Sequence, residues 1–163
     1  MTTLPADLIL RPLGGKSRTL DEQLKLFHLV AIVVDPYTYE SSWILTTGAR
    51  ILAGFSDADC RVAWMVTADE AGARSFLGEL TEQAMTFCDA DREFVKALGA
   101  GELPAFVHVA MDRTVVGLAE GWNPETWQPI ADNLADMMSW TAPAVAIAGD
   151  PVAYAGTPAL GAS

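Results

Sequence analysis

Two cysteines are the residues of this chain with the most reactive side chains. Cys60 and Cys88 lie 28 positions apart and form neither a CxxC pair nor a metal-ligand cluster. Because Asp89 and Asp91 follow Cys88, their charges are expected to raise the pKa of its thiol and make it a poor nucleophile. Cys60, beside Arg61, is expected to be a small core residue. A disulfide between the two is conceivable, although they are expected at opposite ends of their strands.

The stretch "DPYTYESSW", residues 35–43, holds a second set of chemical groups. Glu40 could act as a general acid or base, but at a helix N-terminus the helix dipole favours its ionised form, which suits a cap or a surface position. Ser41 could be a nucleophile only with a base and an oxyanion site, and neither is visible in the sequence. We therefore predict that Ser41 or Ser42 caps the helix that follows.

The remaining candidate ligands are isolated. His28 and His108 lie in or beside predicted strands, where single histidines are usually structural. The acidic pairs in residues 57–59 and 89–91 are spaced like fragments of a calcium loop, but the other ligands of such a loop are missing. We expect no metal site and no cofactor.

Composition narrows the class of protein. The chain has 163 residues, 51% of them hydrophobic, and a formal net charge of −11. A hydrophobic content of this size suits one compact domain, and the negative charge disfavours nucleic acid as a partner. The apolar runs are too short for a membrane span, and no secretory signal is visible at the start. A cytoplasmic location is expected, in which the cysteines stay reduced.

Periodicity predicts the elements that must position these groups. A hairpin is expected over residues 8–20, with Gly14-Gly15 at its turn. The run "HLVAIVV" is continuous and β-branched, as in a central strand buried on both faces. The expected strands are 28–34, 60–66, 84–88, 104–110 and 114–120, and the expected helices are 19–27, 42–54, 68–80, 89–100 with its stop at Gly99, and 123–138 with Asn123 as cap. This order predicts an α/β sandwich: a mixed sheet with helices on both faces.

After Trp140 the composition changes. Residues 141–163 are rich in Ala, Pro and Gly without a period, so we expect an extended or mobile tail after a domain of residues 1–140.

The order of elements and three of its segments resemble the thioredoxin-like superfamily, in its peroxiredoxin (AhpC/TSA) and TlpA-like branch. The similar segments, which belong to a resemblance covering roughly residues 8–138, are "KSRTLDEQLKLFHLVAIVV", "FCDADREFVKALGAGELPAFVHV" and "RTVVGLAEGWNPETWQPIADNLA". The resemblance implies a thioredoxin-like three-layer sandwich with an N-terminal β-hairpin extension. It also implies a cis peptide bond at Leu103-Pro104, facing the loop of residues 35–43.

The same resemblance implies that the usual reactive cysteines are absent. Matched to thioredoxins, both cysteine positions of the motif fall within "YESSW", and matched to peroxiredoxins the reactive position falls on Ser41. A hydroxyl cannot replace a thiolate in peroxide reduction or disulfide exchange.

We therefore expect a redox-inactive thioredoxin-like protein that binds a protein or peptide as an adaptor, accessory subunit or chaperone-like factor. The expected contact residues are the degenerate loop, the facing proline and a nearby tryptophan: Tyr37, Tyr39, Glu40, Ser41, Ser42, Trp43, Leu103, Pro104 and Trp122. Aromatic side chains suit such a contact, although Trp43 and Trp122 could equally be core residues. Two alternatives stay open: a thiol oxidoreductase or peroxidase that uses Cys60 or Cys88, and a structural subunit of a larger assembly docked through its C-terminal tail. The sheet edge and the tail are alternative contact points, for instance in a homo-oligomer.

Overall fold

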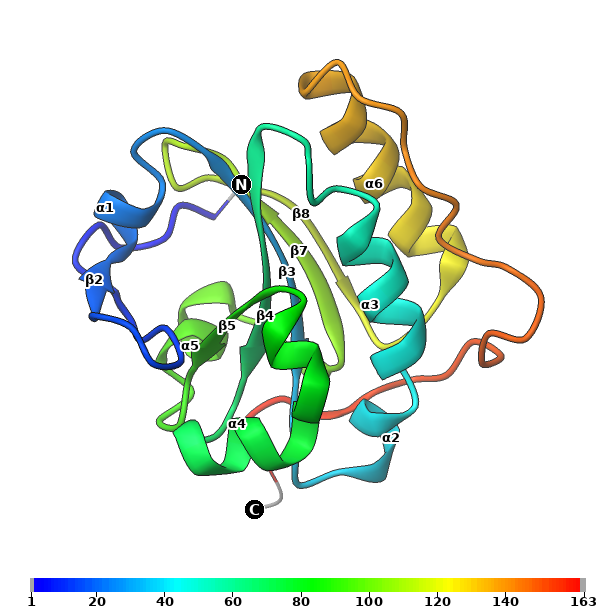
Figure 1. Cartoon of the computed structure of the whole chain (residues 1–163), viewed down its shortest axis with the longest axis horizontal. Coiled ribbons are helices and arrows are strands. Elements are labelled where there is room, and N and C mark those ends of the chain that lie inside the picture. Colours follow the sequence, from blue (N-terminus) through cyan, green and yellow to red (C-terminus); the bar gives the residue numbers. More distant parts are fainter. Residues whose placement is uncertain (1, 162–163) are drawn as a thin grey trace.

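The computed structural model describes residues 2–161, and its centre is a five-stranded mixed sheet in the order β5-β4-β3-β7-β8 (Figure 1). Strands β3 (His28–Val34), β4 (Cys60–Val66) and β5 (Met85–Cys88) run parallel. Strands β7 (Ala105–Val109) and β8 (Val115–Glu120) form an antiparallel hairpin, and β7 pairs antiparallel with β3. The mixed α/β sandwich predicted from the sequence is confirmed.

Strand β3 separates two hydrophobic cores because successive side chains point to opposite faces of a sheet. Val30, Ile32 and Val34 belong to one core, and the residues between them belong to the other. Every residue of β3 is buried, as its β-branched run predicted.

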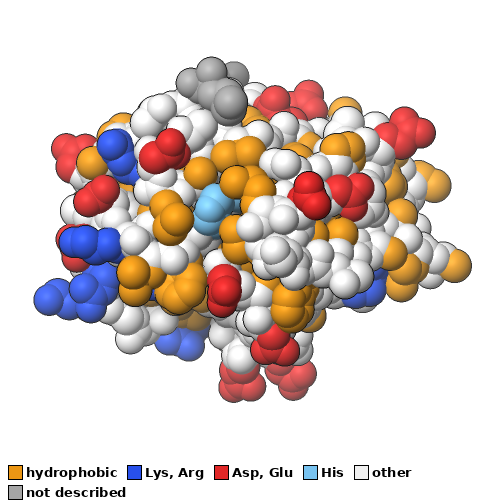
Figure 2. Space-filling model, turned by 90° about the horizontal axis from the view of Figure 1, so that it is seen from above, with side chains coloured by type: hydrophobic (Ala, Val, Ile, Leu, Met, Phe, Trp, Pro, Cys, Tyr) orange, Lys and Arg blue, Asp and Glu red, His pale blue; other side chains and the backbone are white. Residues whose placement is uncertain are grey.

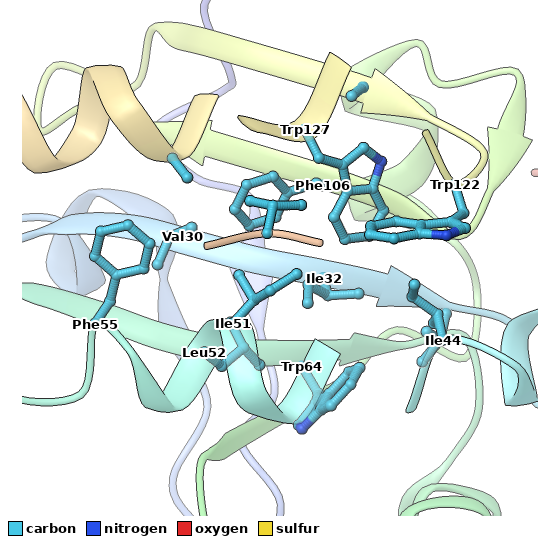
Figure 3. Close-up of a cluster of buried hydrophobic side chains, with 14 of the residues drawn as sticks. Val30, Ile32, Ile44, Ile51, Leu52, Phe55, Trp64, Phe106, Trp122 and Trp127 are labelled. Atoms are coloured by element: carbon cyan, nitrogen blue, oxygen red, sulfur yellow. The ribbon is translucent and has the colours of Figure 1, made fainter. Parts of the chain in front are cut away.

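Helices α3 (Leu45–Ala53), α4 (Glu70–Leu77) and α6 (Pro124–Met137) contribute to the first core, with the short 3-10 helix η1 (Gly78–Glu82) after α4. Aromatic rings fill much of it (Figure 3). The ring of Trp127 on α6 stacks on Phe106 of β7 at a centroid distance of 4.9 Å, and meets Trp122 edge to face at 4.9 Å.

The other face of the sheet is covered by the N-terminal segment and by α5 (Glu93–Leu98). The predicted hairpin is present, with β1 (Ile9–Leu10) paired antiparallel to β2 (Arg18–Thr19). It leads into α1 (Leu20–Gln23), whose N-cap Thr19 accepts a hydrogen bond from the Glu22 backbone N–H. The predicted helix ends at Asn123 and Gly99 are likewise confirmed: the Asn123 side chain caps α6, and Gly99 ends α5 with φ +70°.

The helix predicted over residues 42–54 is confirmed as α3, which begins at Leu45, three residues later than predicted. A short α2 (Tyr39–Ser42), which the sequence did not predict, precedes it. The Ser42 hydroxyl donates to the Tyr39 carbonyl, which gives the backbone an alternative to continuing the helix. Neither serine caps α3, whose first turn has no side-chain cap.

The C-terminal segment returns along the molecule after α6 (Figure 1). Val145 is fully buried, and the Arg50 guanidinium on α3 donates to the carbonyls of Ala144 and Val145 and pairs with Asp150 at 2.7 Å. Further on, β9 (Thr157–Pro158) pairs antiparallel with β6 (Glu102–Leu103). None of the helices within residues 2–161 combines the length and the apolar character needed to cross a membrane.

Candidate functional site

The loop between β3 and α3 holds Ser41 where the resemblance expects a reactive cysteine. Its side chain is fully buried, and its Oγ accepts a hydrogen bond of 2.9 Å from the Asp35 backbone N–H. The hydroxyl therefore fixes the turn at the end of β3. This arrangement accounts for Ser41 without a catalytic or capping role, and corrects the cap predicted for it.

Aromatic side chains surround this buried serine on the outside. Tyr37, Tyr39 and Trp43 are 74%, 83% and 51% exposed. Two shallow cavities, of about 400 Å³ and 370 Å³, lie beside Tyr37 and Ser42, and Phe76 of α4 lines both. We call the exposed residues Tyr37, Tyr39, Ser42 and Trp43 the loop surface.

A buried ion pair between Asp35 and Arg92 holds the start of the loop that carries the loop surface. Asp35 is almost fully buried, and one of its oxygens accepts from Arg92 Nη2 at 3.0 Å while the other accepts from the Tyr37 backbone N–H at 3.0 Å. Arg92 also donates to the Ala159 carbonyl at 2.6 Å. Sequence reasoning missed this pair, and the only local signal was an acidic residue at the end of a buried strand.

The remaining predicted contact residues lie under the C-terminal segment. Leu103 is fully buried, its peptide bond to Pro104 is cis, as the resemblance implies, and its strand β6 is paired with β9. Trp122 is also fully buried, and its indole N–H donates to the Pro151 carbonyl. For Trp122 the structure therefore supports the core alternative rather than the contact, because its ring is packed in the core and its indole N–H is bound by the C-terminal segment.

Tyr154 of the C-terminal segment contacts the loop of residues 35–43. Its hydroxyl donates to the Glu40 carbonyl at 2.6 Å, and its ring meets Trp43 edge to face at a centroid distance of 5.2 Å. Burial, and then the charge of Glu40, raise the pKa of this phenol well above its ordinary value, so it stays protonated and keeps donating at neutral pH. Tyr154 therefore attaches the C-terminal segment to the loop.

The two cysteines are free and stand apart. Cys60 opens β4, whereas Cys88 pairs with Val66 at the other end of that strand, about 20 Å away at the rise of an extended chain. No disulfide can span that distance. Burial and then Asp59 raise the pKa of Cys60 to about 11. Burial also raises the pKa of Cys88, followed by Glu70 and Asp69 of the α4 region rather than by the neighbours that the sequence suggested.

The two histidines that looked isolated in the sequence are in contact. His28 Nδ1 and His108 Nε2 lie 2.8 Å apart across the β3–β7 pair. His108 is fully buried, His28 is nearly so, and Figure 2 shows a histidine side chain at the surface bordered by hydrophobic side chains. Within residues 2–161 no group of three or more His, Cys, Asp or Glu is arranged to hold a metal ion.

Burial predicts how the histidine pair responds to acid. Burial, and then the neighbouring His28, lower the pKa of His108 to about 4, below the unfolded value of about 6.5. As the pH falls below 6.5 the unfolded chain takes up this proton and the folded chain does not. The free energy of unfolding should therefore drop by about 2 kcal/mol between pH 6.5 and pH 4.

Urea unfolding at several pH values measures this effect. The drop in the free energy of unfolding should be smaller in His108→Leu than in the wild type. Carboxylates contribute to the pH dependence of both proteins alike, so the difference between the two pH dependences reports His108. Equal pH dependences in the two proteins would contradict the assignment to His108.

Comparisons with known proteins confirm the fold. No family model matches the chain, and no curated protein matches it. Among solved structures, a secreted disulfide oxidoreductase of Mycobacterium tuberculosis is 17% identical, with a TM-score of 0.58 over 82% of this chain and 96% of that one. Peroxiredoxin Q of Xanthomonas campestris, in a cysteine-to-serine mutant, is 17% identical, with a TM-score of 0.64 over 85% and 96%.

A hypothetical protein of Sinorhizobium meliloti is also 17% identical, with a TM-score of 0.65, and this match covers 98% of the present chain and 93% of that one. At this level of identity the likeness establishes the architecture alone. The thioredoxin-like sandwich implied by the resemblance is confirmed.

Proposed function

We propose that this chain is a thioredoxin-like binding module, an adaptor or chaperone-like accessory protein, that contacts a protein partner through the loop surface and works without thiol chemistry. The observation that carries the proposal is the state of the loop: Ser41 is buried and hydrogen-bonded to a backbone amide, while Tyr37 and Tyr39 beside it are exposed. Large exposed aromatic rings next to a shallow hollow are typical of protein contacts.

The rival function is a thiol oxidoreductase that uses Cys60 or Cys88. One observation favours it: Cys60 lines a cavity of about 260 Å³ together with Phe27, Val62 and Met85. The raised pKa of both thiols opposes it, because the thiolate is the reactive form. A structural subunit docked through its tail would require β9 to leave β6, with which it is paired within the chain. A cytoplasmic location stays a prediction, with which two free thiols agree.

An assay of thiol activity distinguishes the binding module from the thiol oxidoreductase. The wild type should neither consume peroxide nor reduce a disulfide substrate above the rate without protein, and Cys60→Ser with Cys88→Ser should bind partners as the wild type does. A peroxide or disulfide turnover that disappears in the Cys88→Ser or Cys60→Ser variant would establish the oxidoreductase and end the present proposal.

The loop surface has its own test. Tyr37→Ser with Tyr39→Ser should reduce partner capture at least tenfold in a pull-down from the native host, with a change in the free energy of unfolding below about 0.5 kcal/mol because both rings are exposed. Leu26→Ser is the matched control, because Leu26 is 76% exposed and lies before β3, whereas the loop follows it. The proposal fails if the same partners are captured by the tyrosine variant, or are lost equally in the control.

A further inference from the structure

We propose that residues 154–159 are a tethered ligand that occupies a strand-docking groove, and that the groove takes in their place an extended peptide of another protein with the pattern Tyr-x-Gly-x-x-Ala. The external ligand rests on the proposed binding function, whereas the tethered state rests on the contacts of the chain itself.

The groove holds the segment largely by main-chain hydrogen bonds. Tyr154 exchanges two backbone bonds with Trp122, of 2.8 and 2.9 Å, and Thr157 is paired with Leu103. The Ala159 N–H then donates to the Gly101 carbonyl at 3.0 Å. Main-chain pairing of this kind gives affinity for any extended chain, and leaves sequence preference to the side chains that point inward.

Three inward positions restrict the sequence. At the first, Tyr154 packs against Trp43 and its hydroxyl donates to the Glu40 carbonyl. At the second, a Cβ on Gly156 would collide with the Leu103 carbonyl, so only glycine fits. At the third, the side chain of Ala159 is 1% exposed, so only a small side chain fits there. The Ala159 carbonyl also accepts a hydrogen bond from Arg92. Between these positions Ala155 and Pro158 are exposed and free to vary.

The charges around the groove and the way the segment is attached are both consistent with its replacement by an external peptide. Residues 151–161 carry no charged side chain, and Glu102 and Glu120 border the groove, so a neutral or basic peptide fits better than an acidic one. The ion pair Arg50–Asp150 anchors the chain just before the segment. The exposed residues 152 and 153 connect this anchor to the groove. A short tether gives an effective concentration in the millimolar range, so a free peptide meets a strong intramolecular competitor.

The experiment expels the tethered ligand from the full-length chain and supplies it from outside. In Gly156→Val the new side chain collides with Leu103, whereas Ala155→Val places the same side chain on the exposed neighbour. The probe is a fluorescent peptide with the sequence of residues 150–161, followed by anisotropy. We expect Gly156→Val to bind it at least tenfold more tightly than the wild type or Ala155→Val, and a peptide carrying valine in place of Gly156 not to bind.

Equal peptide affinity in all three proteins, or binding of the valine peptide, would overturn the proposal. If circular dichroism shows that Gly156→Val is unfolded, Tyr154→Ala replaces it, and amide exchange of the wild type gives a second measurement. The Tyr154 and Ala159 amides should exchange faster than those of β3, because the segment opens without global unfolding. Exchange as slow as that of β3 would rule out an exchangeable segment.

Two further outcomes assign the occupant. A heterodimer in a mixture of wild type and Gly156→Val, seen by sedimentation, would make a second copy of this chain the occupant and overturn the choice of another protein. Binding of the peptide to Gly156→Val together with Tyr37→Ser and Tyr39→Ser should be unchanged, because those side chains lie outside the groove. Failure of the groove and failure of the loop surface are therefore distinguishable.

Discussion

Trp127→Ala should lower the free energy of unfolding by about 4 kcal/mol, the largest effect expected of any single substitution considered for this chain. The indole is fully buried, stacks on Phe106, meets Trp122 edge to face and donates through Nε1 to the Gly121 carbonyl at 2.9 Å. Alanine would leave a cavity bounded by rigid rings and by β7, so the surroundings could close only in part. Urea unfolding measures the loss.

Trp127→Phe is the matched control. A phenyl ring can keep the stacking on Phe106 but loses the hydrogen bond to Gly121, so a cost of about 1–2 kcal/mol is expected. Trp140→Ala gives a second comparison, since that indole is partly exposed at the end of α6 and should cost less than Trp127. A loss below about 1 kcal/mol for Trp127→Ala would contradict the role given to this ring.

Local patterns were sufficient to predict the sheet and most helix ends. The unbroken apolar run of β3 requires burial on both faces, and Thr19 and Asn123 act on backbone groups within three residues of themselves. Short-range physics of this kind is visible in a single sequence. The break between α2 and α3 was missed because a hydrogen bond of Ser42 to the turn before it competes with helix continuation, and no periodicity reveals that.

The site was harder to predict because its contacts join distant segments. Ser41 and the flanking tyrosines could be located through the resemblance, but the burial of Ser41 depends on the backbone of Asp35. Tyr154, Arg92 and the contact between His28 and His108 are each set by pairings across 57 to 114 positions. The composition of residues 141–163 indicated an extended chain, and nothing local in it indicated that this chain would pair with β6.

Arg92→Met should lower the free energy of unfolding by about 3 kcal/mol, because it leaves the carboxylate of Asp35 buried without its partner. The Arg92 side chain is 15% exposed and that of Asp35 1%, so water can replace little of the lost interaction. Methionine has a similar length and keeps the same left-handed backbone at φ +58°, so the substitution isolates the charge.

A double-mutant cycle distinguishes a lost ion pair from lost packing. Asp35→Asn removes the buried charge, and its amide oxygen can still accept from the Tyr37 N–H. In the Arg92→Met background this second change should restore about 2 kcal/mol, whereas in the wild type it should destabilise the fold. Equal effects of Asp35→Asn in both backgrounds would show that the two residues are not coupled.

The same cycle reports on the site, because Arg92 holds both Asp35 under the loop and the Ala159 carbonyl in the groove. Loss of the guanidinium should therefore raise the exchange rate of the Ala159 amide more than the global loss of stability accounts for. Restoring stability through Asp35→Asn should leave that excess in place, because the side-chain amide introduced at position 35 does not replace the hydrogen bond to Ala159. A return of the Ala159 rate to the wild-type value would show that Arg92 acts on the C-terminal segment only through overall stability.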